Sequence, residues 1–313
     1  MNTATKVAAY AGALAIVFGG AWAAGAAAGP FGDGPSAPNA SEHGAGQPKS
    51  APANAESELP PGLSVADNGY VLDLTQNALP ARTTQTFSFK IARIGGGAVT
   101  EFDVEHEKKL HLVLVRRDGS GFQHVHPEMT ADGTWSVPLT LPAAGSYRVF
   151  ADFKPAGGAK TTLGADLQVA GAYEPQQFAE DSRESEVDGY VVRLTGDLTA
   201  GAESTVTTTV TKDGKPVTDL QPYLGANGHL VALRAADLAY LHVHPQDGPG
   251  SGPDVKFAVE VPTAGRYRLF LDFQHEGKVR TASFTLHTSG AAPAPSPTTA
   301  TPTQTDDHGG HGG

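Results

Sequence analysis

One pattern occurs twice in this chain and largely determines how the chain can be organised. The segment Phe122-Gln123-His124-Val125-His126-Pro127 returns as Tyr240-Leu241-His242-Val243-His244-Pro245, and each copy has another histidine thirteen residues upstream. The two copies of the unit His-x12-His-x-His-Pro therefore hold six of the chain's twelve histidines. Because side chains alternate along a strand, the two histidines of His-x-His point to the same face. The duplication predicts two similar modules in tandem.

Around each copy, short β-rich runs alternate with turn signals such as Arg117-Asp118-Gly119 and Ala131-Asp132-Gly133. About seven strands in roughly a hundred residues is the rhythm of an immunoglobulin-like sandwich. The predicted fold class is all-β, with two tandem immunoglobulin-like β-sandwich domains, an N-terminal hydrophobic helix and disordered tails. The expected strands are 70–74, 86–92, 110–116, 135–141, 146–153 and 161–169 in the first copy, and 205–211, 255–261, 265–273 and 279–286 in the second.

Composition shifts mark the boundaries between these parts. Gly, Pro, Ala and Ser dominate the segments that flank the modules, and such segments cannot bury enough apolar surface to order themselves. The predicted domains are a signal peptide or membrane anchor (1–28), a disordered linker (29–61), β-sandwich repeat 1 (62–172), a linker (173–187), β-sandwich repeat 2 (188–288) and a tail ending in His and Gly (289–313).

The first 28 residues contain an uncharged run from Val7 to Ala28, preceded by Lys6. The run is long enough to span a bilayer, and its small residues would equally serve as a signal-peptidase site. A positive charge on the amino side of the run places the remainder outside the cytoplasm. We therefore expect a secreted protein, or one that contacts the membrane through this segment if it is not cleaved.

Composition excludes several functions. The net charge is −11 with no Lys/Arg cluster, which argues against a nucleic-acid partner. The chain has no cysteine, so disulfides, thiolate sites and cysteine nucleophiles are ruled out. Met1 and Met129 are its only methionines, so a thioether site selective for Cu(I) is not expected. No protein partner is indicated.

The histidine spacing fits a metal site in each repeat. Thirteen residues allow a strand, a turn and a return strand, which would bring the upstream histidine across from the pair. Three imidazoles form a strong site for copper(II) or zinc(II). Asp152 and Asp272 recur beside the two sets and could supply a fourth ligand or hold an imidazole by a hydrogen bond. The candidate ligands are His111, His124, His126, His229, His242 and His244.

A purely structural interpretation remains open at this stage. Neutral histidines can pack half-buried on hydrophobic strands, and the two aspartates could simply pair with Arg148 or Arg268. In the tail, His308 and His311 on a glycine backbone form a weak candidate chelate. His106 and His275 have no counterpart in the other copy and are expected to be solvated surface residues.

The segments His-Leu-Val-Leu-Val-Arg-Arg-Asp, Phe-Gln-His-Val-His-Pro and Gly-Ser-Tyr-Arg-Val-Phe-Ala-Asp-Phe resemble a bacterial extracytoplasmic β-sandwich module of copper and heavy-metal handling, similar to YtkA-like domains. The resemblance covers about 100–170 and 220–288, and implies metal binding without catalysis by the six histidines. The leading hypothesis is thus an extracytoplasmic metal buffer or carrier. The alternative is a non-catalytic structural or interaction protein. An enzyme is disfavoured, because no general base or nucleophile stands at a telling spacing from the motif.

Overall fold

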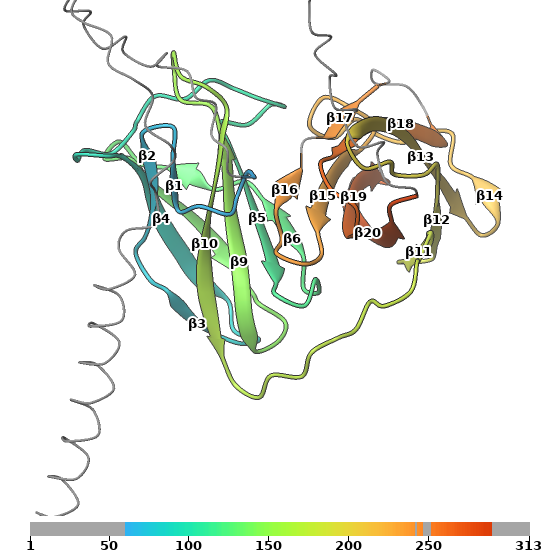
Figure 1. The fold of residues 1–313 in the computed structure, drawn as a ribbon, viewed down its shortest axis with the longest axis horizontal. Coiled ribbons are helices and arrows are strands. Elements are labelled where there is room, and N and C mark those ends of the chain that lie inside the picture. The colour runs from blue at the N-terminus through green and yellow to red at the C-terminus, as the bar shows by residue number, and fades with distance from the viewer. Residues whose placement is uncertain (1–59, 242, 247–251, 290–313) are drawn as a thin grey trace, which may run out of the picture. The chain divides into compact units, whose positions relative to one another are not determined.

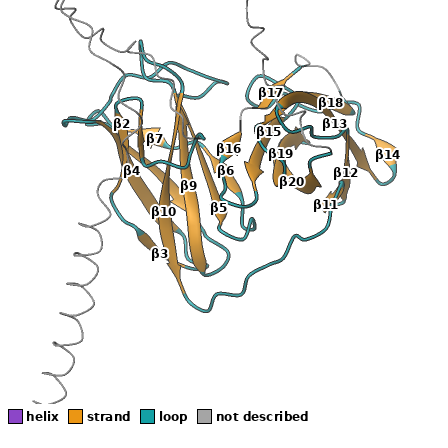
Figure 2. Ribbon diagram, in the orientation of Figure 1, coloured by secondary structure: helices purple, strands orange, loops and turns teal. Residues whose placement is uncertain are grey.

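The computed structural model describes residues 60–241, 243–246 and 252–289, and within them the chain consists only of strands and loops (Figure 2). The predicted leader (1–28), all but the last two residues of the linker (29–61) and all but the first residue of the tail lie outside the described residues. Contacts divide the chain into residues 1–54 and 55–313, and both repeats belong to the second unit. Within the described ranges, no helix is long and apolar enough to cross a bilayer.

Repeat 1 is a sandwich of two five-stranded sheets, whose strands are labelled in Figure 1. The outer sheet has the order β1-β2-β4-β8-β7, and the inner sheet the order β3-β10-β9-β5-β6. All pairings are antiparallel except β10 with β3. The strands are β1 (Ala66–Asp67), β2 (Tyr70–Leu74), β3 (Ala78–Pro80), β4 (Gln85–Arg93), β5 (Leu110–Arg116), β6 (Gln123–Val125), β7 (Glu128–Met129), β8 (Thr134–Leu139), β9 (Gly145–Phe153) and β10 (Thr161–Ala170).

Repeat 2 copies this plan. One sheet has the order β11-β12-β13-β18-β17, with β14 beside β13, and the other has the order β16-β15-β19-β20. The residues Glu184–Val187, expected to be linker, instead form β11 and pair with β12. The strands are β11 (Glu184–Val187), β12 (Tyr190–Thr195), β13 (Ala202–Lys212), β14 (Lys215–Pro216), β15 (His229–Arg234), β16 (Tyr240–Leu241), β17 (Val243–Pro245), β18 (Asp254–Val261), β19 (Arg266–His275) and β20 (Lys278–His287). The predicted all-β sandwich architecture and tandem repeat are confirmed.

The first hairpin of each repeat is set by a two-residue turn. Asn68-Gly69 joins β1 to β2, and Asp188-Gly189 joins β11 to β12; all four residues have positive φ, between 48° and 84°. Tight hairpin turns need two successive left-handed residues, for which Asn-Gly and Asp-Gly are the preferred pairs. These dipeptides therefore fix the register in which each repeat begins.

Each repeat has its own core, and a third apolar cluster joins the repeats. The inner strand β5 is buried along its whole length. Leu110, Leu112 and Leu114 face the core of repeat 1, while Val113 and Val115 belong to the third cluster, which we call the inter-repeat cluster. Because residues alternate between faces, a strand that is apolar throughout is buried on both sides. The inter-repeat cluster comprises Val113, Val115, Phe150, Val231, Leu233, Leu238, Tyr240 and Phe270, with Phe122 packed against it.

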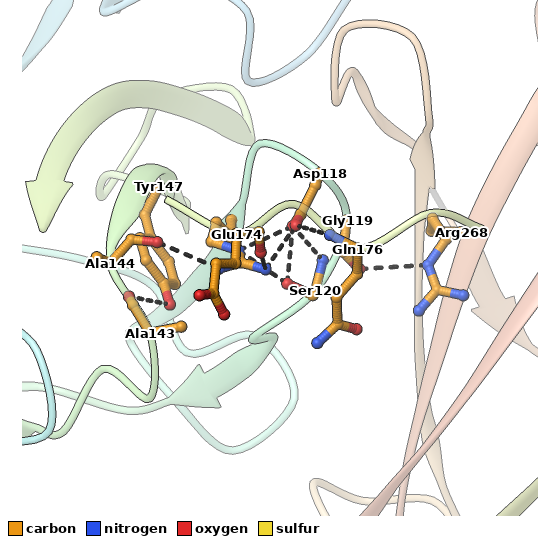
Figure 3. Close-up of polar contacts among 10 residues, drawn as sticks. Asp118, Gly119, Ser120, Ala143, Ala144, Tyr147, Glu174, Gln176 and Arg268 are labelled. Carbon is orange, nitrogen blue, oxygen red and sulfur yellow. Dashed lines mark hydrogen bonds and ion pairs between the residues drawn. The ribbon is translucent and has the colours of Figure 1, made fainter. Parts of the chain in front are cut away.

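A buried carboxylate secures the turn between β5 and β6 (Figure 3). Asp118 accepts two hydrogen bonds from the Arg116 guanidinium at 3.0 and 2.6 Å, one from the Ser120 hydroxyl at 2.7 Å and one from the Gln176 backbone N–H at 2.8 Å. Arg268 of repeat 2 donates to the Gly119 carbonyl in the same turn at 3.3 Å. The turn thereby holds the connecting segment and repeat 2 beside the β5–β6 hairpin, which carries the predicted histidine motif.

Candidate metal centre

Strand alternation decides where His111 points. It precedes Val113 and Val115 by two and four residues, so it lies on the face of β5 that carries the inter-repeat cluster. The hairpin pairs Val113 with His124, and paired residues of neighbouring strands point to the same face of a sheet, so His124 lies on this face as well. His111 is 3% exposed. The upstream histidine and the downstream pair of repeat 1 are thus gathered at the edge of the contact between repeats.

Repeat 2 applies the same alternation. His229 precedes Val231 and Leu233 on β15, and these two residues belong to the inter-repeat cluster. The carboxylates also match, because His111 is paired with Asp152 on β9 and His229 with Asp272 on β19. The two inner sheets therefore bring a histidine and an aspartate each to the same region of the molecule.

Three imidazoles of repeat 1 converge on one another. His111 Nδ1 lies 3.1 Å from His124 Nε2 and 3.2 Å from His126 Nε2. The corresponding ring centroids are 5.3 and 5.0 Å apart. His229 of repeat 2 joins them, since His111, His124 and His229 each offer a ligand atom within 4.8 Å of the others. We call these four residues the histidine cluster: His111, His124, His126 and His229.

The outer nitrogens of two rings are held by groups that only accept hydrogen bonds. His111 Nε2 lies 3.0 Å from the Glu105 carbonyl, and His124 Nδ1 lies 2.8 Å from Asp272 Oδ2. A neutral imidazole carries a single proton, which these acceptors draw to the outer nitrogen. His111 Nδ1 and His124 Nε2 are then both lone-pair nitrogens, and they face each other at 3.1 Å. With both rings in this neutral form, a cation between or beside the two nitrogens would remove the repulsion between their lone pairs.

Burial keeps most of these rings neutral. It lowers the pKa of His111 to about 4 and that of His126 to about 3, with the neighbouring His124 acting in the same direction. The pKa of His229 is lowered well below its usual value, again chiefly by burial. Neutral imidazole is the form that binds metal ions, so desolvation prepares these side chains as ligands.

His106 stands beside this cluster, contrary to its predicted role as a solvated surface residue. Its ring centroid is 5.5 Å from that of His229 and 6.1 Å from that of His111. Burial lowers its pKa, and the charges of Lys160 and His244 lower it further. His275, the other histidine expected at the surface, is also buried at 7% exposure, with Nδ1 2.7 Å from the Tyr190 hydroxyl. Neither position repeats between the modules, so the duplicated pattern gave no signal for them.

The two predicted aspartates have different partners. Asp272 accepts from His124 of the other repeat and from the Thr281 hydroxyl at 2.6 Å. Asp152 accepts from the Thr162 hydroxyl at 2.8 Å and lies 3.4 Å from Lys160 Nζ. Neither carboxylate is paired with an arginine among the described contacts, since Arg148 binds Asp166 and the Gly62 carbonyl, and Arg268 binds backbone carbonyls and Thr285.

A separate site in repeat 2 stays a prediction, because His242 lies outside the described residues. The structure gathers His229 with the three histidines of repeat 1, because the inner sheets of the two repeats contact each other through their second apolar faces. His244 is exposed on β17. His242, His308 and His311 lie outside the described residues. The metal-ligand role of all these residues stays a prediction.

Comparison with known proteins identifies the family. A model of a domain of unknown function, DUF8832, matches residues 64–171 and again 185–290, which is more than half of the chain. The chain belongs to this family, in two tandem copies. The match returns a DUF8832 domain and carries no indication of a YtkA-like copper module, so that finer resemblance stays a prediction. A search of curated proteins finds no match.

The solved structures that match this pair of DUF8832 domains are only distantly similar to it. The Escherichia coli adhesin FdeC is 16% identical over 72% of this chain and 66% of its own, with a TM-score of 0.24. Invasin, a bacterial integrin-binding protein, is 16% identical over 72% of this chain and 40% of its own, with a TM-score of 0.23. A putative membrane-anchored protein from Corynebacterium diphtheriae is 10% identical over 73% and 60%, with a TM-score of 0.22. The chain thus spans less than two thirds of each of these structures, and TM-scores this low support no inference about function.

Proposed function

We propose that this protein binds a copper(II) or zinc(II) ion in the histidine cluster and acts as a metal buffer or carrier without catalysis. The ion would be held between the two repeats rather than once in each. The leader predicted at residues 1–28 makes an extracytoplasmic location the expected one.

One observation carries the proposal: His111 Nδ1 and His124 Nε2 face each other at 3.1 Å, while the outer nitrogen of each ring already has an acceptor. Lone pairs at this distance repel, and a shared cation turns the repulsion into two bonds. Their outer nitrogens are already bonded to a carbonyl and a carboxylate, which is the way proteins orient metal-binding imidazoles.

The spacing supports a shared ion. Nitrogens bound to one tetrahedral zinc at about 2.0–2.1 Å lie about 3.3 Å apart. The nitrogen pairs within the cluster are separated by 3.1 and 3.2 Å. An all-nitrogen ligand set suits Zn(II) and Cu(II), and the absence of cysteine removes the softer ligands that would favour other ions.

A proton is the competing cation, and it leads to the second candidate function. If His124 were an imidazolium paired with Asp272, its Nε2–H would donate to His111 Nδ1 and no metal would be needed. The cluster would then be part of a rigid contact between tandem immunoglobulin-like modules, and the protein would have a structural or interaction role. The continuous apolar packing of the inter-repeat cluster beside the histidines favours this alternative.

Titration of the full chain with Zn(II) and Cu(II) distinguishes the two candidates. The background is the His308→Ala/His311→Ala variant, which removes the predicted tail chelate. His111→Ala/His124→Ala added to this background should weaken the tightest binding at least 100-fold, because a site deprived of two imidazoles retains too few strong ligands. The matched control is His287→Ala, because His287 is an exposed histidine on β20 that is paired with Asp181. Equal affinity in the cluster variant and the control would leave the structural function as the explanation.

A further inference from the structure

The loop before β5 contains a tight left-handed turn, and the loop before β15 contains its counterpart. Glu105 and Lys108 exchange backbone hydrogen bonds at 2.8 and 3.0 Å, so His106 and Glu107 are the two central residues of a tight turn. Both have positive φ, 47° and 64°. This left-handed pair is normally Asn-Gly or Asp-Gly, as at Asn68-Gly69 in the same repeat. Each non-glycine residue in this conformation costs about 1–2 kcal/mol.

The strained turn serves the histidine cluster in two ways. The Glu105 carbonyl at its start holds His111 Nε2 at 3.0 Å. The His106 ring at its tip lies 5.5 Å from the His229 ring, with the two planes at 75°. The corresponding turn of repeat 2, between Tyr223 and Ala226, has Leu224 in the same left-handed conformation. The turn therefore belongs to the plan of both repeats, and the imidazole at position 106 is particular to repeat 1.

The two rings make an edge-to-face contact, and the distance between them is also compatible with imidazoles that share an ion. Two imidazoles bound to one tetrahedral ion at about 2.0–2.1 Å place their ring centroids about 5.2 Å apart. Within the histidine cluster the ring centroids of His111 and His124 are 5.3 Å apart, and those of His124 and His229 are 5.0 Å apart. The value of 5.5 Å for His106 and His229 belongs to the same range.

Charges around His106 are compatible with a cation. Lys160 is the positive group that influences both His106 and His229. Its ammonium lies 3.4 Å from the Asp152 carboxylate, which offsets the charge. Glu105 and the exposed His244 also act on His106.

From these observations we infer that His106 is a metal ligand, and that with His229 it forms a second ion position beside the His111–His124–His126 site. This inference rests on the proposed metal-binding function. His229 lies between the two positions, since its ring is within 5.5 Å of both His106 and His111.

The test counts ions bound per chain by equilibrium dialysis and elemental analysis, using the full chain with His308→Ala/His311→Ala. His106→Asn is the informative variant, because asparagine tolerates positive φ and so preserves the turn while removing the imidazole. Glu107→Gly is the matched control, which relaxes the turn and keeps His106. We expect two Zn(II) ions per chain in the background and in Glu107→Gly, and one in His106→Asn.

Each other outcome contradicts the inference in a different way. Two ions in both the background and His106→Asn would show that His106 is not a ligand. One ion in the background would show that no second position exists, while leaving the proposed function intact. Loss of both ions in His106→Asn would make His106 part of the inner site. No bound ion in the background would overturn the proposed function together with this inference.

Discussion

Replacing Asp272 by asparagine should weaken metal binding, although Asp272 belongs to repeat 2 and the proposed ligand that it orients, His124, belongs to repeat 1. Its carboxylate accepts one hydrogen bond from His124 Nδ1 at 2.8 Å and one from the Thr281 hydroxyl at 2.6 Å, and its side chain is 3% exposed. The amide of asparagine has a single acceptor oxygen for these two donors. Loss of the group that orients a metal-bound histidine costs about 10–100-fold in affinity, or about 1.4–2.8 kcal/mol. The metal-free protein should lose about 1–3 kcal/mol of stability, because one buried donor is left without a partner.

The affinity is measured by competition with a chromogenic chelator, in the full chain lacking His308 and His311, and the stability by urea unfolding in EDTA. Asp219→Asn is the control, since Asp219 accepts from His275 Nε2 at 3.0 Å in repeat 2, away from the cluster. The control should leave zinc affinity unchanged. If Asp272→Asn binds zinc as tightly as the background does, the hydrogen bond to His124 plays no part in metal binding and the tautomer argument fails.

Three further outcomes are expected. In EDTA the folded protein should lose stability as the pH falls from about 6.5 to about 4, by about 3 kcal/mol from His111 alone, because in this range the unfolded histidine takes up a proton and the folded one, with its lowered pKa, does not. Chemical unfolding at several pH values measures this loss, and a flat profile would mean that His111 is already protonated in the folded protein. Phe270→Ala should lower the free energy of unfolding by about 3–5 kcal/mol and also weaken zinc binding, since the ring is 2% exposed and stacks on Phe122 with centroids 4.1 Å apart in the inter-repeat cluster. Unchanged zinc affinity would show that the site does not depend on the contact between repeats. Asp118→Asn should lower the free energy of unfolding by about 1–3 kcal/mol and speed proteolysis in the segment around Gln176, whereas Asp132→Asn in an exposed turn should do neither. Equal proteolysis of the two variants would contradict the anchoring role of Asp118.

Much of each module follows from local patterns. The runs at 70–74 and 110–116 are strands with the same bounds in the structure, and the others differ by one to three residues at their ends. These segments combine β-branched or aromatic residues with clear turn signals. The sequence does not predict strand β11, because Glu184–Val187 is charged and resembles a linker. Its side chains alternate between exposed and half-buried, so it has no apolar face that would indicate a strand. Its pairing with β12 depends on the Asp188-Gly189 turn.

The site was predictable only within one repeat. The thirteen-residue step from His111 to His124 implied a hairpin, and the structure pairs the two strands as the spacing required. The contribution of His229 depends on the second apolar face of each inner sheet, which periodicity alone cannot assign to a partner. The apolar run Leu112-Val113-Leu114-Val115 within strand β5 was the available signal, because a strand with no wet face must be covered on both sides. His106 could not be found this way, because the corresponding turn of repeat 2 has Leu224 at its position.

The central claim is that a metal ion is bound by imidazole nitrogens of the histidine cluster at the contact between the repeats. Anomalous diffraction at the zinc edge from crystals of the full chain grown with zinc tests it most directly. The account predicts an anomalous peak about 2.0–2.1 Å from at least three nitrogens of the histidine cluster, with His111 Nδ1 and His124 Nε2 among them. Crystals in which zinc occupies only other positions, with His124 hydrogen-bonded to both His111 and Asp272, would contradict it.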